Sequence, residues 1–221
     1  MIAYLQQHQG YVWQLTLLHL ALCGEALGIA LLIALPLGIL ISRYHALYVP
    51  IIGLFGAIYT IPSLALFALL VPRFGITQVT ALIALVVYAQ FILIRNVATG
   101  LRGVDRAVIE AAAGMGMSPA QVLWKVELPL ALPVIVAGLR IATVTVIAVA
   151  TIATYISVHE LGDILSEGVS KGDDGEIEAG ALAVGLLAVL ADLLLRLLEY
   201  WAARYSGRTP APARGGRRAA A

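Results

Sequence analysis

Five long apolar runs, separated by short polar stretches, dominate the pattern along the chain. They cover residues 20–42, 49–71, 78–98, 132–156 and 179–198. Each run is long enough to cross the roughly 30 Å hydrocarbon core of a bilayer as a helix, which takes about 20 residues. A helix also satisfies its own backbone polar groups in lipid. The pattern therefore predicts an all-α, polytopic membrane bundle of about five transmembrane helices.

The N-terminal segment has a different pattern. Residues 4–18 are apolar but are interrupted by four glutamines and a histidine. We interpret residues 1–18 as an interfacial helix leading into the first span, with Tyr4, Tyr11 and Trp13 at the level of the lipid headgroups. The segment lacks the positive start of a signal peptide.

Composition supports a membrane protein. Hydrophobic residues make up 61% of the chain and charged residues 12%, which is outside the range of ordinary soluble domains. The 221 residues have room for one membrane domain, which we place at 19–200. The single cysteine, Cys23, lies in an apolar run, so it forms no intrachain disulfide and is interpreted as a small buried side chain.

The charges predict an orientation. With the loop after 78–98 in the cytosol, ten cations share that side, namely Arg43, Arg95, Arg102, Arg106, Lys125, Arg204, Arg208, Arg214, Arg217 and Arg218. Only Arg73 and Lys171 then lie outside. The loop before the fifth span faces the exterior and holds Glu160, Asp163, Glu167, Asp173, Asp174, Glu176 and Glu178. The N-terminus lies outside, and residues 201–221 form a basic cytosolic tail that is predicted to be disordered.

Residues 105–115 predict a short helix in the cytosolic loop. Asp105 caps its start, and small or flexible apolar residues recur at helical spacing, namely Val108, Ala111, Ala112 and Met115. A face of small residues permits close approach to another surface. Gly114 and Gly116 then end or turn the helix, because glycine accepts the left-handed conformation of a C-terminal cap.

A second short helix follows at once. Ser118 is placed to cap it, Pro119 suits its first position, and Gln121 completes a capping box. Pro129 and Pro133 mark the entry into the next span. From these residues alone, the helix–turn–helix elbow is either a docking surface or a surface feature without a partner.

A known sequence motif favours docking. Glu110-Ala111-Ala112, with Gly116 six positions after the glutamate and Leu128-Pro129 further on, resembles the EAA loop of permease subunits of binding-protein-dependent ABC importers. We place this loop at about 99–131. Residues 59–65, 95–96, 100–101, 127–133 and 138–144 resemble the osmoprotectant branch, whose permeases serve glycine betaine, choline and carnitine. This chain departs from the branch at one place. The branch usually has a glycine-rich stretch before Leu-Gly-Asp, whereas here Ser157-Val158-His159-Glu160, which contains no glycine, precedes Leu161-Gly162-Asp163.

The resemblance implies a fold, a site and partners. The fold is the MetI-like permease bundle with a cytosolic coupling helix. That helix and its turn, which dock on an ATPase subunit, comprise Glu110, Ala111, Ala112, Met115, Gly116 and Met117, and a structural loop comprises Ser118, Pro119, Leu128 and Pro129. The implied partners are two cytosolic ABC ATPase subunits, a second permease copy or a paralogue, an extracytoplasmic solute-binding protein and membrane lipid. The implied location is a bacterial or archaeal cytoplasmic membrane.

Several polar residues in the spans are candidates for a translocation path, namely Thr60, Ser63, Gln90, Thr143 and Thr151. Serine and threonine in spans more often bond to their own helix backbone, so both interpretations stay open. Glu25 is either functional, at the outer interface, or paired with a neighbouring helix. Arg140 is expected to extend to the cytosolic interface, with a solute contact as the alternative. Gly24 and Gly28 suit a close helix crossing.

Other signatures are missing from the sequence. It has no GxxxxGK[ST] phosphate loop and no metal-ligand spacing, so we expect a transport subunit that is not an enzyme and has no metal or cofactor of its own. No nucleic-acid partner is expected. The alternatives to a permease subunit are a self-sufficient carrier or channel, which the lack of an internal repeat disfavours, and a non-transporting scaffold.

Overall fold

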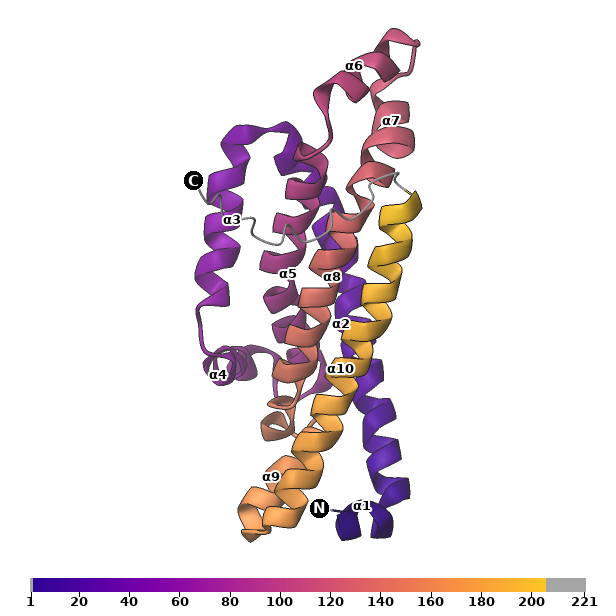
Figure 1. The fold of residues 1–221 in the computed structure, drawn as a ribbon. Helices are drawn as coiled ribbons and strands as arrows, with labels where there is room; N and C mark the ends of the chain where they lie inside the picture. The colour runs from indigo at the N-terminus through magenta and orange to yellow at the C-terminus, as the bar shows by residue number, and fades with distance from the viewer. Residues whose placement is uncertain (1, 206–221) are drawn as a thin grey trace, which may run out of the picture.

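The computed structural model describes residues 2–205, and every regular element in that range is a helix (Figure 1). In chain order they are α1 (Ile2–Gln7), α2 (Gln9–Arg43), α3 (His45–Tyr59), α4 (Ser63–Phe74), α5 (Gln78–Arg102), α6 (Arg106–Gly114), α7 (Pro119–Val122), the π-helix η1 (Leu123–Glu127), α8 (Leu128–Ala150), the 3-10 helix η2 (Ala153–Ile156), α9 (Gly162–Lys171) and α10 (Asp174–Tyr205). The predicted all-α fold class is confirmed.

Within residues 2–205, four helices are long and apolar enough to cross a membrane, namely Gln9–Arg43, Gln78–Arg102, Pro119–Ala150 and Asp174–Arg204. A fifth crossing is obtained if α3 and α4, which are bent by 96°, count as one broken span. In Figure 1, α3 leaves the end that carries α6 and α7, and α4 then turns across the bundle axis before α5 returns. The bundle therefore has α6 and α7 at one end and α1 and α9 at the other.

The prediction of one continuous helix over residues 49–71 is wrong. Pro62 lacks a backbone donor and disfavours helical geometry at the residue before it, so α3 ends at Tyr59 and α4 begins at Ser63. The Tyr88 hydroxyl donates a hydrogen bond to the carbonyl oxygen of Ile61, which satisfies an acceptor at the break. A contact from α5 thus stabilises the break between α3 and α4.

Three other boundaries differ from the prediction. Helix α2 already begins at Gln9, so residues 9–18 are continuous with the first span, and their interfacial position stays a prediction. Helix α8 ends at Ala150, short of residue 156. Helix α10 begins earlier than expected because the Asp173 carboxylate caps it, and it continues to Tyr205, so residues 201–205 are helical. The rest of the predicted tail, 206–221, lies outside the described residues.

The core is centred on α5, which packs against α2, α3, α4 and α8. Close crossings occur where glycine meets a neighbouring helix, as at Gly38 against Val97 and Gly138 against Asn96. A Cβ atom at Gly24 or Gly28 would meet nothing within 4 Å, so the crossing expected there does not occur within one chain. Helix α10 packs along α8 and α9, and its most apolar stretch contains no buried residue.

Substituting Gly138 with valine is expected to destabilise the bundle. A Cβ atom there would lie 2.3 Å from Cβ of Asn96, and Asn96 is held in place because its Nδ2 donates to the Ile92 carbonyl at 2.8 Å. Overpacking of this kind costs about 1–3 kcal/mol or more. Thermal unfolding in detergent should show a lower Tm than for the matched control Gly185→Val, because a Cβ at Gly185 meets nothing within 4 Å. Equal Tm values for the two variants would contradict this packing.

Candidate functional site

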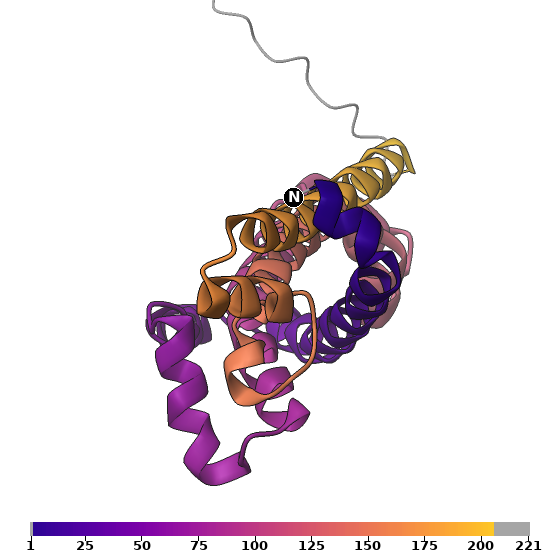
Figure 2. The ribbon, with the colours of Figure 1, turned by 90° about the horizontal axis from the view of Figure 1, so that it is seen from below.

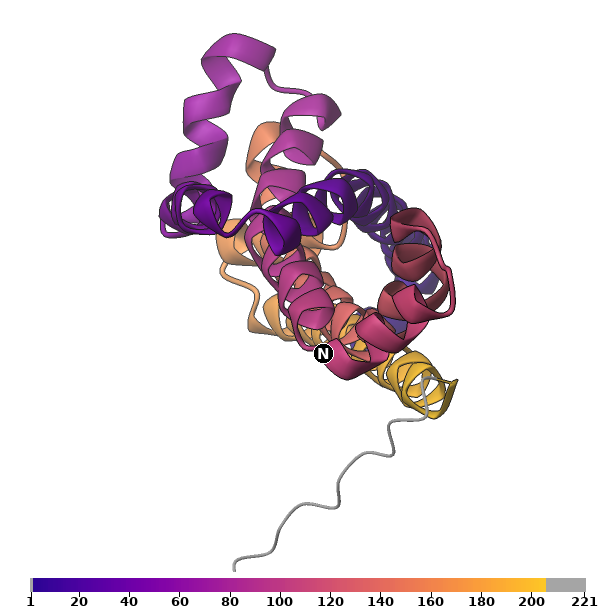
Figure 3. The same ribbon diagram turned by 90° about the horizontal axis from the view of Figure 1, so that it is seen from above.

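The candidate site is the elbow formed by residues 105–127, which comprises α6, α7 and η1. It projects beyond the bundle, where α6 lies across the continuation of α8 (Figures 1 and 3). The segment begins after α5 ends at Arg102 and merges into α8 at Leu128. The elbow therefore connects two spans directly.

The first helix of the elbow forms as the sequence predicts. The Asp105 carboxylate accepts a hydrogen bond from the Ala107 backbone at 2.9 Å and caps α6. Of the two candidate turn residues, Gly116 takes the left-handed conformation, with φ of 85°. Its backbone N–H donates to the Ala113 carbonyl at 2.9 Å, and that of Met117 donates to Ala112 at 3.3 Å. The turn thus satisfies carbonyl groups that the helix end leaves free.

The second helix begins with the predicted capping box. The Ser118 hydroxyl accepts from the Gln121 backbone at 3.4 Å, while the Gln121 side chain accepts from the Ser118 backbone at 2.8 Å, and Pro119 occupies the first turn. The placement of Leu128 and Pro129 in a structural loop is wrong, because both lie in α8. The π-helix η1 precedes them, and its wider turn accommodates the proline ring without ending the helix.

The outer face of α6 is exposed. Val108 is 42% exposed and Met115 is 76% exposed. Glu110, Ala111 and Gly116 are exposed as well, whereas Ala112 is buried. The predicted apolar stripe is therefore divided, with Ala112 facing the elbow and the others facing outward. This leaves a surface of small side chains with one flexible methionine and one carboxylate, which permits close contact with another protein.

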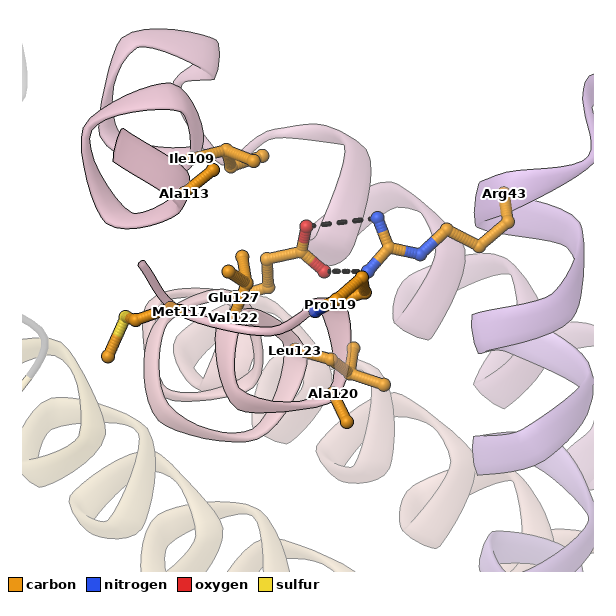
Figure 4. Close-up of a pocket in the computed structure, with 9 residues that line it drawn as sticks. All are labelled: Arg43, Ile109, Ala113, Met117, Pro119, Ala120, Val122, Leu123 and Glu127. Atoms are coloured by element: carbon orange, nitrogen blue, oxygen red, sulfur yellow. Dashed lines mark hydrogen bonds and ion pairs between the residues drawn. The ribbon is translucent and has the colours of Figure 1, made fainter. Parts of the chain in front are cut away.

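A hollow of about 430 Å³ lies between α6 and the helix that follows it (Figure 4). Ile109 and Ala113 face it from α6, and Met117, Val122 and Leu123 face it from the other side. The Glu127 carboxylate, 2% exposed, points from η1 toward Arg43 at the end of α2. Nη1 of Arg43 donates to Oε1 of Glu127 at 3.0 Å, and Nη2 donates to Oε2. Sequence reasoning missed this pair.

Three of the five candidate path residues use their hydroxyls within their own helices. The hydroxyls of Thr60, Thr143 and Thr151 donate to carbonyl oxygens of their own helices at 2.7–2.8 Å, as the alternative interpretation proposed. Ser63 begins α4 next to the break. Gln90 is the exception, because it is 2% exposed, its Nε2 donates to the Ala30 carbonyl at 3.1 Å, and its Oε1 is buried without a partner.

Two intramembrane charges have partners in other helices. The Arg140 guanidinium lies 3.1 Å from the Asp192 carboxylate and 2.8 Å from that of Glu199, both on α10. It therefore links two helices instead of extending alone to the interface. Glu25 is exposed, and its Oε2 accepts from Nε2 of Gln78 at 3.4 Å. This matches the pairing alternative for Glu25.

At the opposite end, α1 lies beside the start of α10, which packs along α9 (Figure 2). Most of the acidic residues of the loop 160–178 form hydrogen bonds within the chain. Asp163 accepts from Thr154 and His159, Glu167 from Tyr11 and Lys171, and Glu176 from Tyr4 and Lys171. Hydrogen bonds to Glu167 and Glu176 raise the pKa of Lys171, and the bond to Lys171 lowers the pKa of Glu167. Burial, then the bond to Glu176, raises the pKa of Tyr4 to about 12. Most of the carboxylates in this loop are thus held by hydrogen bonds within the chain.

A buried pair at this end was also not predicted. Nδ1 of His19 donates to Oε2 of Glu160 at 2.7 Å, and both side chains are fully buried. The Glu160 carboxylate also accepts from the Gly162 backbone at 2.7 Å. No group of three or more His, Cys, Asp or Glu side chains within residues 2–205 is arranged to hold a metal ion.

Comparison with known proteins identifies the family. Residues 30–204 match the model of the binding-protein-dependent transport system inner membrane component. The chain belongs to this family. A choline transport system permease protein, OpuBB of Bacillus subtilis (strain 168), is 37% identical over 90% of this chain and 91% of its own length. An osmoprotectant import permease protein, OsmW of Salmonella typhimurium (strain LT2), is 40% identical over 90% of this chain and 94% of its own.

Solved structures share the fold. An inward-facing structure of the MetNI methionine ABC transporter superposes with a TM-score of 0.76 at 22% identity, covering 86% of this chain and 95% of that one. At this identity the likeness establishes the fold alone. Together with the family match, it makes this chain a membrane-spanning permease subunit of an ABC importer. The ATPase is a separate subunit, and membership of the family implies ATPase and solute-binding protein partners.

Proposed function

We propose that this permease forms the path for a small compatible solute of the glycine betaine, choline or carnitine type. The observation that carries the proposal is the set of relatives named for these solutes, which are 34–40% identical to this chain over 83–90% of its length. Fold similarity to a methionine transporter does not favour methionine, because at 22% identity it bears on the fold alone.

We further propose that the elbow is the coupling helix that docks on the ATPase. The outward face of α6 with its turn supports this, because small exposed side chains permit close approach. The docking residues are Glu110, Ala111, Met115, Gly116 and Met117. Ala112, which is buried and faces the elbow, would support them from behind. Two ATPase subunits would bind two elbows, one from this chain and one from a second copy or a paralogue. Closure of the ATPases on ATP would then shift the bundle between inward-open and outward-open states.

The elbow end is proposed to lie in the cytosol. Four cations of the elbow region support this assignment, namely Arg43, Arg102, Arg106 and Lys125. The N-terminus and α9 would then face the extracytoplasmic binding protein, and α10 would end in the cytosol. Among the path candidates, Gln90 has the strongest support, because its buried Oε1 lacks a partner. Thr60, Ser63, Thr143 and Thr151 remain proposals of the same kind.

The test is reconstitution of the permease with its ATPase and binding protein in liposomes. Uptake of labelled choline, glycine betaine or carnitine should require ATP and both partners. Flux through the permease alone would instead favour a self-sufficient carrier. Ligand titration of the purified binding protein, with polar amino acids as competitors, separates the solute class from the importer assignment.

Reversing one charge on the elbow should break ATPase docking. Glu110→Lys places a cation on the exposed face of α6, and we expect ATP-dependent uptake and co-purification of the ATPase to fall together. Glu178→Lys is the matched control for co-purification of the ATPase, because Glu178 is also exposed and lies at the opposite end of the bundle. Unchanged ATPase binding by Glu110→Lys would count against docking at this face.

A further inference from the structure

The Arg43–Glu127 pair connects the elbow to a span that is not its neighbour in sequence. Arg43 is the last residue of α2, and Glu127 is the last residue of η1, 84 residues later. The guanidinium contacts both carboxylate oxygens, a bidentate geometry that fixes orientation as well as distance. A cation at the C-terminus of α2 also interacts favourably with the helix dipole.

The pair stands apart from the other contacts of the elbow. Among the described residues, this pair is the only side-chain hydrogen bond or ion pair that joins residues 105–127 to another helix. The hollows on either side of it, of about 430 and 420 Å³, leave the elbow loosely packed there. Glu127 is nonetheless buried, so its charge depends on Arg43 for compensation. The pair is the most specific connection between the elbow and α2.

Through α2, the ion pair connects the elbow to the core of the bundle. Helix α2 packs along the central helix α5, so a displacement of the end of α2 is passed to the core. The elbow is covalently continuous with α5 and α8, so both helices move when the elbow moves. The ion pair connects α2 to the elbow as well. A second arginine, Arg102, donates to the Ile41 carbonyl and ties the end of α2 to α5.

We propose that Arg43 and Glu127 are positioning residues that make α2 follow the elbow when the ATPase moves it. The inference rests on the proposed docking of the elbow on the ATPase. The ion pair stays formed through the transport cycle, and it transmits the displacement of the elbow to α2. Its loss leaves ATPase docking intact and lets the elbow move without carrying α2.

The experiment uses the complete importer in liposomes and measures ATP hydrolysed per solute taken up. Glu127→Gln and Arg43→Gln should each raise this ratio roughly tenfold, which corresponds to about 1.4 kcal/mol, with the ATPase still bound. The exchange Arg43→Glu with Glu127→Arg should restore part of the coupling, although it places an anion at the C-terminus of α2. Arg43→Lys, which keeps the charge but loses the bidentate geometry, should be intermediate.

Lys125→Gln is the matched control. Lys125 lies in the same π turn and is exposed, and none of the described residues makes a hydrogen bond or ion pair with its side chain, so the ratio should stay within about twofold. Two results would contradict the proposed positioning role. One is an unchanged ratio of ATP hydrolysed to solute taken up in both Gln variants, and the other is an exchange variant that couples no better than the single variants. If the single variants fail to assemble, Arg43→Lys and the exchange variant still decide the matter. ATPase release in Glu127→Gln would refute this inference, whereas ATPase retention in Glu110→Lys would refute docking.

Discussion

Replacing Gly116 with valine should lower ATP-driven uptake at least about tenfold while leaving the chain in the membrane. Gly116 has φ of 85°, and a Cβ atom built on it meets nothing within 4 Å, so the obstacle is the backbone conformation and not space. A left-handed conformation costs an ordinary L-residue about 1–2 kcal/mol, and a β-branched residue more. The turn would open, and its hydrogen bonds to Ala112 and Ala113 would be lost.

The change in the turn acts mainly on the exposed face of α6 that is proposed to dock. The turn sets the angle between α6 and α7, so a changed turn moves Glu110, Ala111 and Met115 together. Because the turn lies outside the bundle core, insertion and span packing should be unaffected. We expect uptake below about one tenth of the unsubstituted rate, which corresponds to roughly 1.4 kcal/mol.

Two variants separate conformation from bulk. Gly116→Asn should retain more uptake than Gly116→Val, because asparagine tolerates the left-handed region better than other residues. Gly114→Ala should be close to unsubstituted, because Gly114 ends α6 without a positive φ and has open space around it. Uptake in reconstituted importer, normalised to permease abundance, is the measurement. Full activity of Gly116→Val would show that the geometry of this turn is not needed for transport.

Sequence reasoning succeeded where the determinants are local. Asp105, Ser118 and Gln121 cap helices through bonds to residues two or three positions away, and all three were predicted. The apolar runs located the spans for the same reason, since each helix forms its own backbone bonds. The bent pair α3–α4 was missed although Pro62 is a local signal, because hydropathy alone does not distinguish a broken span from a continuous one.

Contacts between distant residues were not predictable. Arg43 and Glu127 lie 84 residues apart, and His19 and Glu160 lie 141 apart, so no spacing in the sequence links them. The acidic loop is the clearest case, because the sequence places its seven carboxylates in one exterior loop but indicates no partner for any of them. The structure shows most of them bonded to side chains or backbone groups, some from α1 and α2 at the far end of the sequence.

Removing His19 should destabilise the whole bundle. His19 and Glu160 are both fully buried, and the carboxylate keeps only the Gly162 backbone as a donor once the imidazole is gone. Breaking a buried pair by removing one partner costs about 3–5 kcal/mol, because a charge is left buried without compensation. His19→Leu should therefore lower the Tm by roughly 10 °C for a chain of this size.

The second substitution tests the cause. In the His19→Leu background, Glu160→Gln removes the charge while its side-chain oxygen still accepts from Gly162, so the double variant should regain a large part of the lost Tm. The chain carries its own probe of unfolding, since its single cysteine, Cys23, is buried one helical turn beyond His19. The rate at which a thiol-reactive dye labels Cys23 on heating then reports opening at the pair itself. A double variant no more stable than His19→Leu would mean that lost packing, and not the unpaired carboxylate, sets the cost.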